Sequence, residues 1–370
     1  MDSKSQEYVE LMFENGDIYK GQVQDDKFNG YGLYSKKDKF IYVGQFQNSQ
    51  FHGYGKYWDP AQLMLFQGEF QNGQKSGRGR LESYRNNISY SSLVPQQADV
   101  DSKNYLQYIR DQVIVEIRKD LENEVSAQIK YANDDMNSHN KQDSFDNDTI
   151  EENRKERTRC TFEKRYLGEF RSDFKNGSGV MKYSNSDVFI GQFKNDKRHG
   201  CGRYIYLSAG AQWLMYLGEF NEDVMSGFGK MRFVNGDLYT GEFKNNKMHD
   251  ENANIEYSNL DIYKGGVAQN MKHSKNGEYL YSNGDRYLGD FRNDQKHGDG
   301  VITLLRADRV INNCFKDDIT YSGQFEKDRK TGKGQVDIRA ENLRITALFD
   351  QNELINDKKA IIEYMNEQNE

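Results

Sequence analysis

The chain has 370 residues, a formal net charge of −7 and only 35% hydrophobic residues, which excludes one large compact core. Aromatic residues make up 13%, with 33 glycines and 2 prolines, so a disordered chain is excluded too. Three separated cysteines (Cys160, Cys201, Cys314) and no signal-like apolar run predict a reducing, intracellular compartment. No stretch approaches the roughly 20 apolar residues that a membrane-spanning helix needs.

A repeat begins within residues 1–84. Its clearest copies lie further along the chain and read YLGEF, at 166–170 and 216–220. An aromatic residue opens each copy, glycine follows at plus 2 and phenylalanine at plus 4. Alternate residues share one face of a strand, so this spacing predicts a strand. Steps of mostly 23 or 24 residues are typical of stacked repeats. The copies begin at Tyr19, Tyr42, Phe66, Tyr166, Phe189, Tyr216, Tyr239, Tyr263, Tyr287 and Tyr321.

The second half of each copy carries a glycine pair, as in FHGYG at 51–55, which we interpret as a turn before a second strand. Each copy is therefore predicted to be a hairpin. If its centre lies between plus 8 and plus 9, Phe220 faces Gly229 and Glu219 faces Lys230, so that the phenylalanine ring covers bare backbone. Turns with the sequence NGD, such as 235–237, would join the copies into one antiparallel meander.

Residues 85–163 interrupt the repeat and contain an apolar residue at every fourth position, which predicts an amphipathic helix at about 101–132. This helix either packs on the chain's own sheet or is offered to a partner. Seven carboxylates against one lysine between 133 and 152 predict a disordered acidic linker at about 133–157. The apolar stripe is Tyr105, Ile109, Val113, Ile117, Leu121, Val125 and Ile129.

Residues 164–345 hold copies four to ten. Copies seven and eight have Asp250 and Asn252, then Ser274 and Asn276, in place of the glycine pair, so we expect altered strand pairing there. Residues 346–370 are predicted to form a capping strand, continuing the partial copy around Ala347, and a C-terminal helix with Ile361, Ile362 and Met365 on one side.

YxGxF followed by a turn, GxG and about ten more residues resembles the MORN repeat family over roughly two thirds of the chain. The resemblance implies an all-β fold, an elongated antiparallel β-meander solenoid of about ten hairpins with one helical insertion. Twenty strands would give a sheet on the order of 100 Å long. Members of this family include radial spoke head components of motile cilia, cytoskeletal scaffolds and membrane-junction proteins.

The motifs that could carry chemistry predict that the protein is not an enzyme and binds neither a metal nor a cofactor. Five histidines share one phase of the repeat: His52, His199, His249, His273 and His297. Equivalent residues of stacked hairpins lie ~9 to 10 Å apart, too far to share one zinc ion. The glycine pairs lie within hairpins, and the chain has neither GxxxxGK[ST] nor a GxSxG elbow.

The candidate binding residues lie on one face and two edges of the predicted sheet. The aromatic face either binds a partner or packs on itself; its residues are Tyr166, Phe170, Tyr216, Phe220, Tyr239, Phe243, Tyr287 and Phe291. Cations at the first turn predict a basic edge: Lys194, Lys197, Arg198, Lys244, Lys247, Arg292, Lys296, Arg329 and Lys330. Carboxylates at the connecting turn predict an acidic edge: Asp17, Asp187, Asp237, Asp261 and Asp285. These edges are either solvated surface or sites for phosphates or charged proteins.

The leading hypothesis is a non-enzymatic scaffold that binds other proteins within a larger assembly. The family resemblance implies a cytoplasmic location in a cilium or axoneme, as in radial spoke heads, or in the cytoskeleton. The alternative is a peripheral membrane protein whose basic edge binds anionic phosphoinositides. Regulation of a phosphoinositide kinase is a further alternative, and no nucleic-acid partner is expected.

Overall fold

The structure is a computed structural model that describes residues 7–84, 162–305, 310–311, 314–315, 319–355 and 360–364. The chain divides into two compact units, Met1–Ala209 and Gly210–Glu370. In the described residues all strands pair antiparallel, 26 of them in the meander ladders of the two units and two in a separate short pair. The prediction of an all-β antiparallel meander is confirmed.

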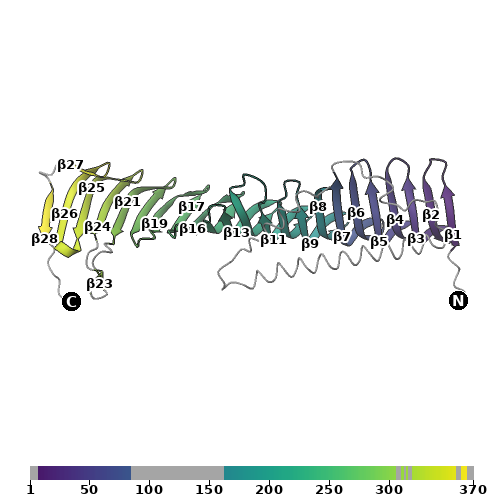
Figure 1. The fold of residues 1–370 in the computed structure, drawn as a ribbon, viewed down its shortest axis with the longest axis horizontal. Helices are drawn as coiled ribbons and strands as arrows, with labels where there is room; N and C mark the ends of the chain where they lie inside the picture. Colours follow the sequence, from purple (N-terminus) through teal and green to yellow (C-terminus); the bar gives the residue numbers. More distant parts are fainter. Residues whose placement is uncertain are drawn as a thin grey trace. The chain divides into compact units, whose positions relative to one another are not determined.

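In the first unit each strand pairs with the next along the chain (Figure 1). β7 and β8 pair directly although residues 85–161 separate them in sequence. The predicted amphipathic helix and acidic linker fall in those residues, outside the described part of the chain. The strands are β1 (Glu7–Met12), β2 (Ile18–Gln24), β3 (Lys27–Lys36), β4 (Phe40–Gln47), β5 (Gln50–Asp59), β6 (Met64–Gln71), β7 (Gln74–Tyr84), β8 (Phe162–Arg171), β9 (Phe174–Lys182), β10 (Val188–Lys194) and β11 (Lys197–Ile205).

The second unit continues the same pattern of sequential pairing. The long step after Tyr287 contains the separate pair, β22 with β23. A 3-10 turn, η4 (Arg339–Glu341), precedes β26. The strands are β12 (Trp213–Asn221), β13 (Val224–Phe233), β14 (Leu238–Lys244), β15 (Lys247–Met248), β16 (Asp250–Glu256), β17 (Ile262–Ala268), β18 (Met271–Lys272), β19 (Ser274–Leu280), β20 (Arg286–Arg292), β21 (Gln295–Leu304), β22 (Val310–Ile311), β23 (Cys314–Phe315), β24 (Ile319–Glu326), β25 (Arg329–Ile338), β26 (Leu343–Asp350), β27 (Glu353–Ile355) and β28 (Ile361–Tyr364).

The predicted C-terminal helix is wrong for the residues that the structure describes there. Ile361 and Ile362 lie in β28, which pairs with β26. The edge of β26 presents unpaired backbone groups, and an extended segment satisfies them directly. A short apolar run is thus used as a strand because a partner edge is available.

The hairpin turn lies two residues earlier in each copy than the sequence predicted. In the copy opened by Tyr216, the turn residues are Glu222 and Asp223, with φ of 49° and 72°. Two consecutive residues in the left-handed region define a type I′ turn, whose twist matches that of the strands. The glycine pair that we interpreted as a turn lies inside β13.

A β-bulge accounts for the difference in register. Gly218 pairs with Gly229 and Phe220 with Met225, so β13 holds two more residues than β12 between these pairs. The prediction that Phe220 faces Gly229 is therefore wrong. Gly227, the first glycine of the pair, has a φ of 84°, which favours glycine within the bulge.

The glutamine or glutamate at plus 3 satisfies a backbone donor that the bulge leaves without a ladder partner. The Gln45 side-chain oxygen accepts the Tyr54 N–H at 2.9 Å. Gln22 accepts the Tyr31 N–H at 2.8 Å in the first copy. A side-chain acceptor at plus 3 therefore stabilises the bulge, because a buried, unpaired N–H is costly.

The opening aromatic residue lies over the glycine row and forms the core. Tyr216 is fully buried, and a Cβ on Gly229 would lie 2.6 Å from its ring. Its hydroxyl donates to the Glu219 carbonyl at 2.9 Å. The opening tyrosine, not Phe220, thus covers the bare backbone. The same i to i+3 hydroxyl bond occurs at Tyr19, Tyr42, Tyr166, Tyr239, Tyr263, Tyr287 and Tyr321.

Phenylalanine at plus 4 links consecutive copies through edge-to-face packing. The Tyr166 ring contacts Phe170 of its own copy at 5.2 Å and Phe193 of the next copy at 5.0 Å, both nearly perpendicular. Tyr287 does the same with Phe291 and Phe325, each at 5.2 Å. The aromatic rings therefore form a herringbone row within each unit, a geometry that aromatic rings favour.

Two sets of polar contacts join neighbouring copies at their turns. At the hairpin tips, the Asn246 side-chain oxygen accepts the Met225 N–H at 2.8 Å, and the Asn246 N–H donates to the Met225 carbonyl at 3.1 Å. At the connecting turns, Asp237 accepts the Ser258 N–H at 2.9 Å. Each copy is thus fixed to the next along both edges of the ladder.

Copies seven and eight keep the hairpin while their second strands are broken. β15 and β16 are separated by His249, whose N–H donates to the Glu242 carbonyl at 3.0 Å. The Asp250 carboxylate accepts the N–H groups of Glu242 and Asn252, both at 2.7 Å. A carboxylate therefore satisfies the backbone where the glycine pair is missing.

We expect Gly229→Ala to lower the free energy of unfolding by about 2 kcal/mol or more, because a methyl group has no room under the Tyr216 ring. The matched control is Gly210→Ala, where a Cβ meets nothing within 4 Å and only its φ of 81° opposes alanine, at about 1 kcal/mol. Urea unfolding measures both. Equal losses would contradict the steric role of the glycine row.

Candidate interaction surfaces

The aromatic residues predicted to bind a partner are core residues. Tyr166, Phe170, Tyr216, Phe220, Tyr239, Phe243, Tyr287 and Phe291 are all between 0 and 4% exposed. They pack on the glycine row and on one another, so they present no accessible face. This is a correction of the predicted partner-binding surface: the bulge bends each strand, and a tightly curved strand buries rings that a flat sheet would expose.

Three of the nine predicted basic-edge residues are half-buried over aromatic rings. Lys330 lies 4.6 Å from the centre of the Tyr321 ring, and Arg198 lies 5.1 Å from the Tyr204 ring. Lys296 lies 5.5 Å from the Tyr287 ring. All three hold the plus 9 position, where Phe28 stacks on Tyr19 at 3.6 Å in the first copy. The plus 9 side chain therefore covers the opening ring and is unavailable as a free charge.

Lys272 is the most enclosed of these cations, although the sequence did not single it out. Its Nζ lies 5.1 to 5.8 Å from the rings of Tyr257, Tyr263, Tyr279 and Phe291. Burial lowers the pKa of this ammonium, while Asp294 raises it and offsets part of the effect. Burial also raises the pKa of Tyr263 to about 12. The chain's own lysine thus fills an aromatic cage.

The other six predicted basic-edge residues are exposed at the hairpin tips: Lys194, Lys197, Lys244, Lys247, Arg292 and Arg329. They share most tips with carboxylates that serve the backbone, such as Asp294, which accepts the Lys272 N–H at 2.8 Å. The tip at 244–247 carries two lysines and two asparagines. The basic edge is therefore smaller and more mixed in charge than predicted.

The predicted acidic edge is a row of buried and half-buried hydrogen-bond acceptors. Asp17, Asp187 and Asp261 are buried, and Asp237 and Asp285 are half-buried. Hydrogen bonds from the Tyr34 hydroxyl, at 2.8 Å, and the Lys37 N–H, at 3.0 Å, lower the pKa of Asp17. These carboxylates join consecutive connecting turns and do not offer a free anionic surface.

The outer face, defined as the side of each sheet opposite the glycine row, differs between the units. In the first unit it carries six buried apolar side chains: Leu33, Ile41, Val43, Trp58, Leu65 and Leu167. In the second unit it exposes apolar side chains of the strands: Phe228, Leu280, Leu288 and Leu348. The sequence did not single out these residues; the plus 1 position of Leu288, for example, is apolar in some copies and polar in others.

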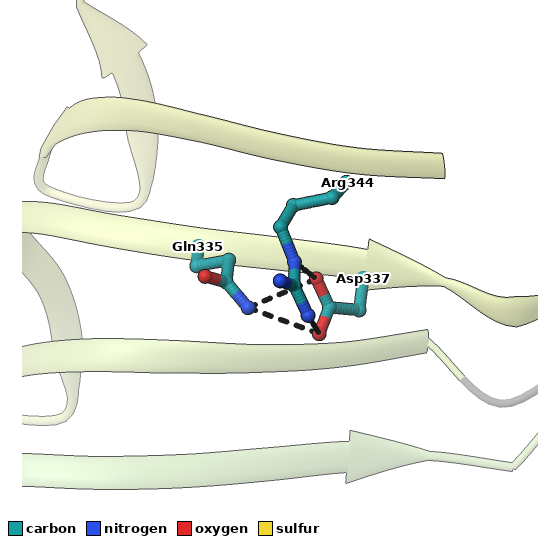
Figure 2. A network of polar contacts seen from close by, with 3 residues as sticks. All are labelled: Gln335, Asp337 and Arg344. Atoms are coloured by element: carbon teal, nitrogen blue, oxygen red, sulfur yellow. Dashed lines mark hydrogen bonds and ion pairs between the residues drawn. The ribbon is translucent and has the colours of Figure 1, made fainter. Parts of the chain in front are cut away.

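Figure 2 shows the polar network at the C-terminal part of the second unit's outer face, where Arg344 of β26 reaches Asp337 of β25. Two guanidinium nitrogens donate to the two carboxylate oxygens at 2.9 and 3.1 Å, and the Gln335 amide donates to both at 3.0 Å. The Arg344 contact lowers the pKa of Asp337. This bidentate pair links two strands on a polar part of the face.

No cluster of three or more metal-ligating side chains occurs among the residues that the structure describes. The described segments also hold no helix of the length and apolarity that crossing a membrane requires. Cys201 is a free, exposed thiol.

We expect Lys272→Met to leave stability at pH 7 unchanged or higher, because burial disfavours the charged lysine and the equivalent plus 9 residues Met225 and Met248 are already methionines. The pKa of Lys272 in the folded protein lies below 10.5, so the unfolded chain binds this proton more tightly than the folded protein. The cost of burying the charged lysine is therefore relieved as pH rises toward 10.5.

The stability difference between Lys272→Met and wild type should therefore shrink between neutral pH and pH ~10.5. Urea unfolding across this range measures it. Lys264→Met, at an exposed position of β17, is the control. A Lys272→Met protein that is much less stable at pH 7 would show instead that the cation is needed in the cage.

No curated protein matches the chain. Among solved structures, the SAS-4 (dCPAP) TCP domain of Drosophila melanogaster, in complex with a proline-rich motif of Ana2 (dSTIL), is 20% identical, with 38% of this chain and 72% of that chain covered and a TM-score of 0.23.

The MORN repeat family matches nine segments: 19–39, 42–62, 66–87, 166–188, 189–207, 216–238, 239–249, 287–304 and 321–335. The copy opened by Tyr263 lies outside these matches, yet it has the same buried ring and hydroxyl bond. Sequence motif, hairpin geometry and family match agree: the chain is a MORN-repeat protein.

Proposed function

We propose that this MORN-repeat protein is a non-enzymatic scaffold that binds partner proteins through the outer face of its second unit. The observation that carries the proposal is a strip of apolar side chains across four strands: Ile262, Leu280, Leu288 and Val301. Leu280, at the end of β19, and Leu288, within β20, are 39% and 40% exposed. Apolar groups left in water on a regular sheet favour contact with another protein.

The register supports treating these side chains as one surface, which we call the second-unit strip. Ile262 pairs directly with Leu280, and Leu288 pairs directly with Val301. Leu280 lies diagonally across from Leu288, two residues beyond the Glu278 pair. Direct and diagonal neighbours on one face are within contact distance of a single partner element.

The inner face and the connecting turns of the described residues offer less. The inner face is filled by its own rings, and the connecting-turn carboxylates bond to the backbone. Because the repeats are already rigid, they lose little conformational entropy when they bind a partner side chain. A scaffold role in a larger assembly follows from this combination of a rigid frame and an exposed apolar strip.

The proposed location is a cilium or axoneme, of the radial spoke head kind, or the cytoskeleton, within the cytoplasm. Its support is the family resemblance together with the scaffold architecture. Fractionation of cells that express the tagged chain tests it. Recovery in axonemal or cytoskeletal fractions is expected, and exclusive recovery in other fractions would contradict the proposal.

The scaffold proposal predicts that Leu280→Asp with Leu288→Asp lowers partner recovery at least about tenfold, since central apolar contacts carry most binding energy. The control is Thr240→Asp, which adds a carboxylate elsewhere on the same outer face. Quantitative crosslinking mass spectrometry in native extract gives the readout, with urea unfolding to show that both variants fold. Equal recovery with both variants would rule out the strip as the binding surface.

Binding to anionic phosphoinositides through the hairpin tips is the second candidate, favoured by the six exposed cations. Reversing Lys194, Lys197, Lys244 and Lys247 to glutamate should abolish binding to phosphoinositide vesicles, and raised salt should weaken wild-type binding steeply. Neutral phosphatidylcholine vesicles are the control in a flotation assay. Equal binding to both vesicle types would exclude this function.

A further inference from the structure

Part of the outer face of the first unit is buried although its sheet is a single layer in the described residues. Six apolar side chains on it are only 4 to 7% exposed, among them Trp58 at 5%. Neighbours on the same face cover the sides of such a residue, but its end points away from the sheet. The described strands of this unit, β1 to β11, all belong to the one ladder and supply no second layer.

Four described neighbours, Tyr31, Tyr54, Leu63 and Tyr84, pack against this cluster, and the burial of equivalent positions varies along the chain. The plus 1 position places its side chain on the outer face in every copy. Val43 and Leu167 hold this position in the first unit and are 4% and 5% exposed. Leu288 holds it in the second unit and is 40% exposed. The same strand position is therefore covered in the copies opened by Tyr42 and Tyr166 and open in the copy opened by Tyr287, while Ile190 and Leu217 are half-buried.

We propose that residues 101–132 cover this face as an amphipathic helix, with their apolar stripe against Leu33, Ile41, Val43, Trp58, Leu65 and Leu167. The segment fits because of where its ends lie. Tyr84, the last residue before it in β7, contacts Trp58 at 6.1 Å between ring centres. Tyr84 pairs with Phe162, where the chain returns in β8. The segment thus leaves and re-enters the sheet at the margin of the buried cluster.

The segment is also long enough to cross the cluster. The cluster spans six strands from β3 to β8, or ~24 Å at ~4.8 Å per strand step. The stripe from Tyr105 to Ile129 extends ~36 Å in a helix at 1.5 Å per residue. Residues 85–100 can reach ~50 Å when extended, so they place no limit on the position of the helix.

The chain's own segment is favoured as the occupant because it is covalently linked to the sheet. Every molecule carries it, at an effective concentration of about millimolar for a short flexible connection. A second copy or another protein would have to displace it. This assignment concerns the first unit and is independent of the partner-binding strip proposed for the second.

The test measures thiol labelling in the full chain, with its three cysteines replaced by serine and one cysteine introduced at plus 1. Val43→Cys should react with maleimide at least about tenfold more slowly than Leu288→Cys, its matched position in the second unit. Adding Ile117→Asp should restore fast labelling at position 43, because the added carboxylate would be buried. Leu167→Cys is the substitute reporter if Val43→Cys does not fold.

Ser126→Asp is the control within the segment. In a helix Ser126 lies about 180° around the axis from Ile117, so the same charge should leave position 43 protected. Fast labelling of Val43→Cys in the otherwise unchanged chain would overturn the proposal. So would protection that is lost on dilution, which indicates a second copy, or protection that Ile117→Asp and Ser126→Asp affect equally. Circular dichroism shows that each variant retains its sheet.

Discussion

The structure depends on one contact, a tyrosine or phenylalanine ring lying flat over a row of glycines. Because Gly218 and Gly229 have no side chains, the Tyr216 ring reaches the backbone of both strands and is fully buried. A sheet of one layer has no second sheet to cover its apolar groups. Here the strands bend at a bulge, and each ring buries itself in its own hairpin and against the phenylalanine of the next. The core is therefore divided among the repeats, and each repeat needs only its neighbours.

Because the rings are internal, many charged side chains have structural roles. The plus 9 cation covers the opening ring, as Lys330 covers Tyr321. The connecting-turn carboxylate, such as Asp261, holds the next turn through the Ser282 N–H at 2.8 Å. A charged residue that recurs at one phase of a repeat therefore does not by itself mark a binding edge. Its role can be to accept hydrogen bonds from backbone groups or to cover an aromatic ring.

Function is then left to the positions that the repeat does not need. Outer-face residues do not pack under the opening ring, so their identity can vary between copies without loss of the aromatic core. Leu288 and Lys264 both occupy the plus 1 position, and one is apolar while the other is charged. Variation of this kind can give one unit an internal cover and another an exposed strip. The fold supplies rigidity, and the outer face supplies specificity.

The sequence by itself determined the repeat, its ten starting residues, the antiparallel hairpins and the family, because these follow from local spacing and turn residues. Tertiary structure decided the register, since a bulge moved the turn by two residues and placed Tyr216, not Phe220, over Gly229. It also decided which candidate residues are accessible: the aromatic face became core, and the acidic row became buried or half-buried. Period-two spacing predicts which residues share a face, but curvature and neighbouring copies determine whether that face meets water.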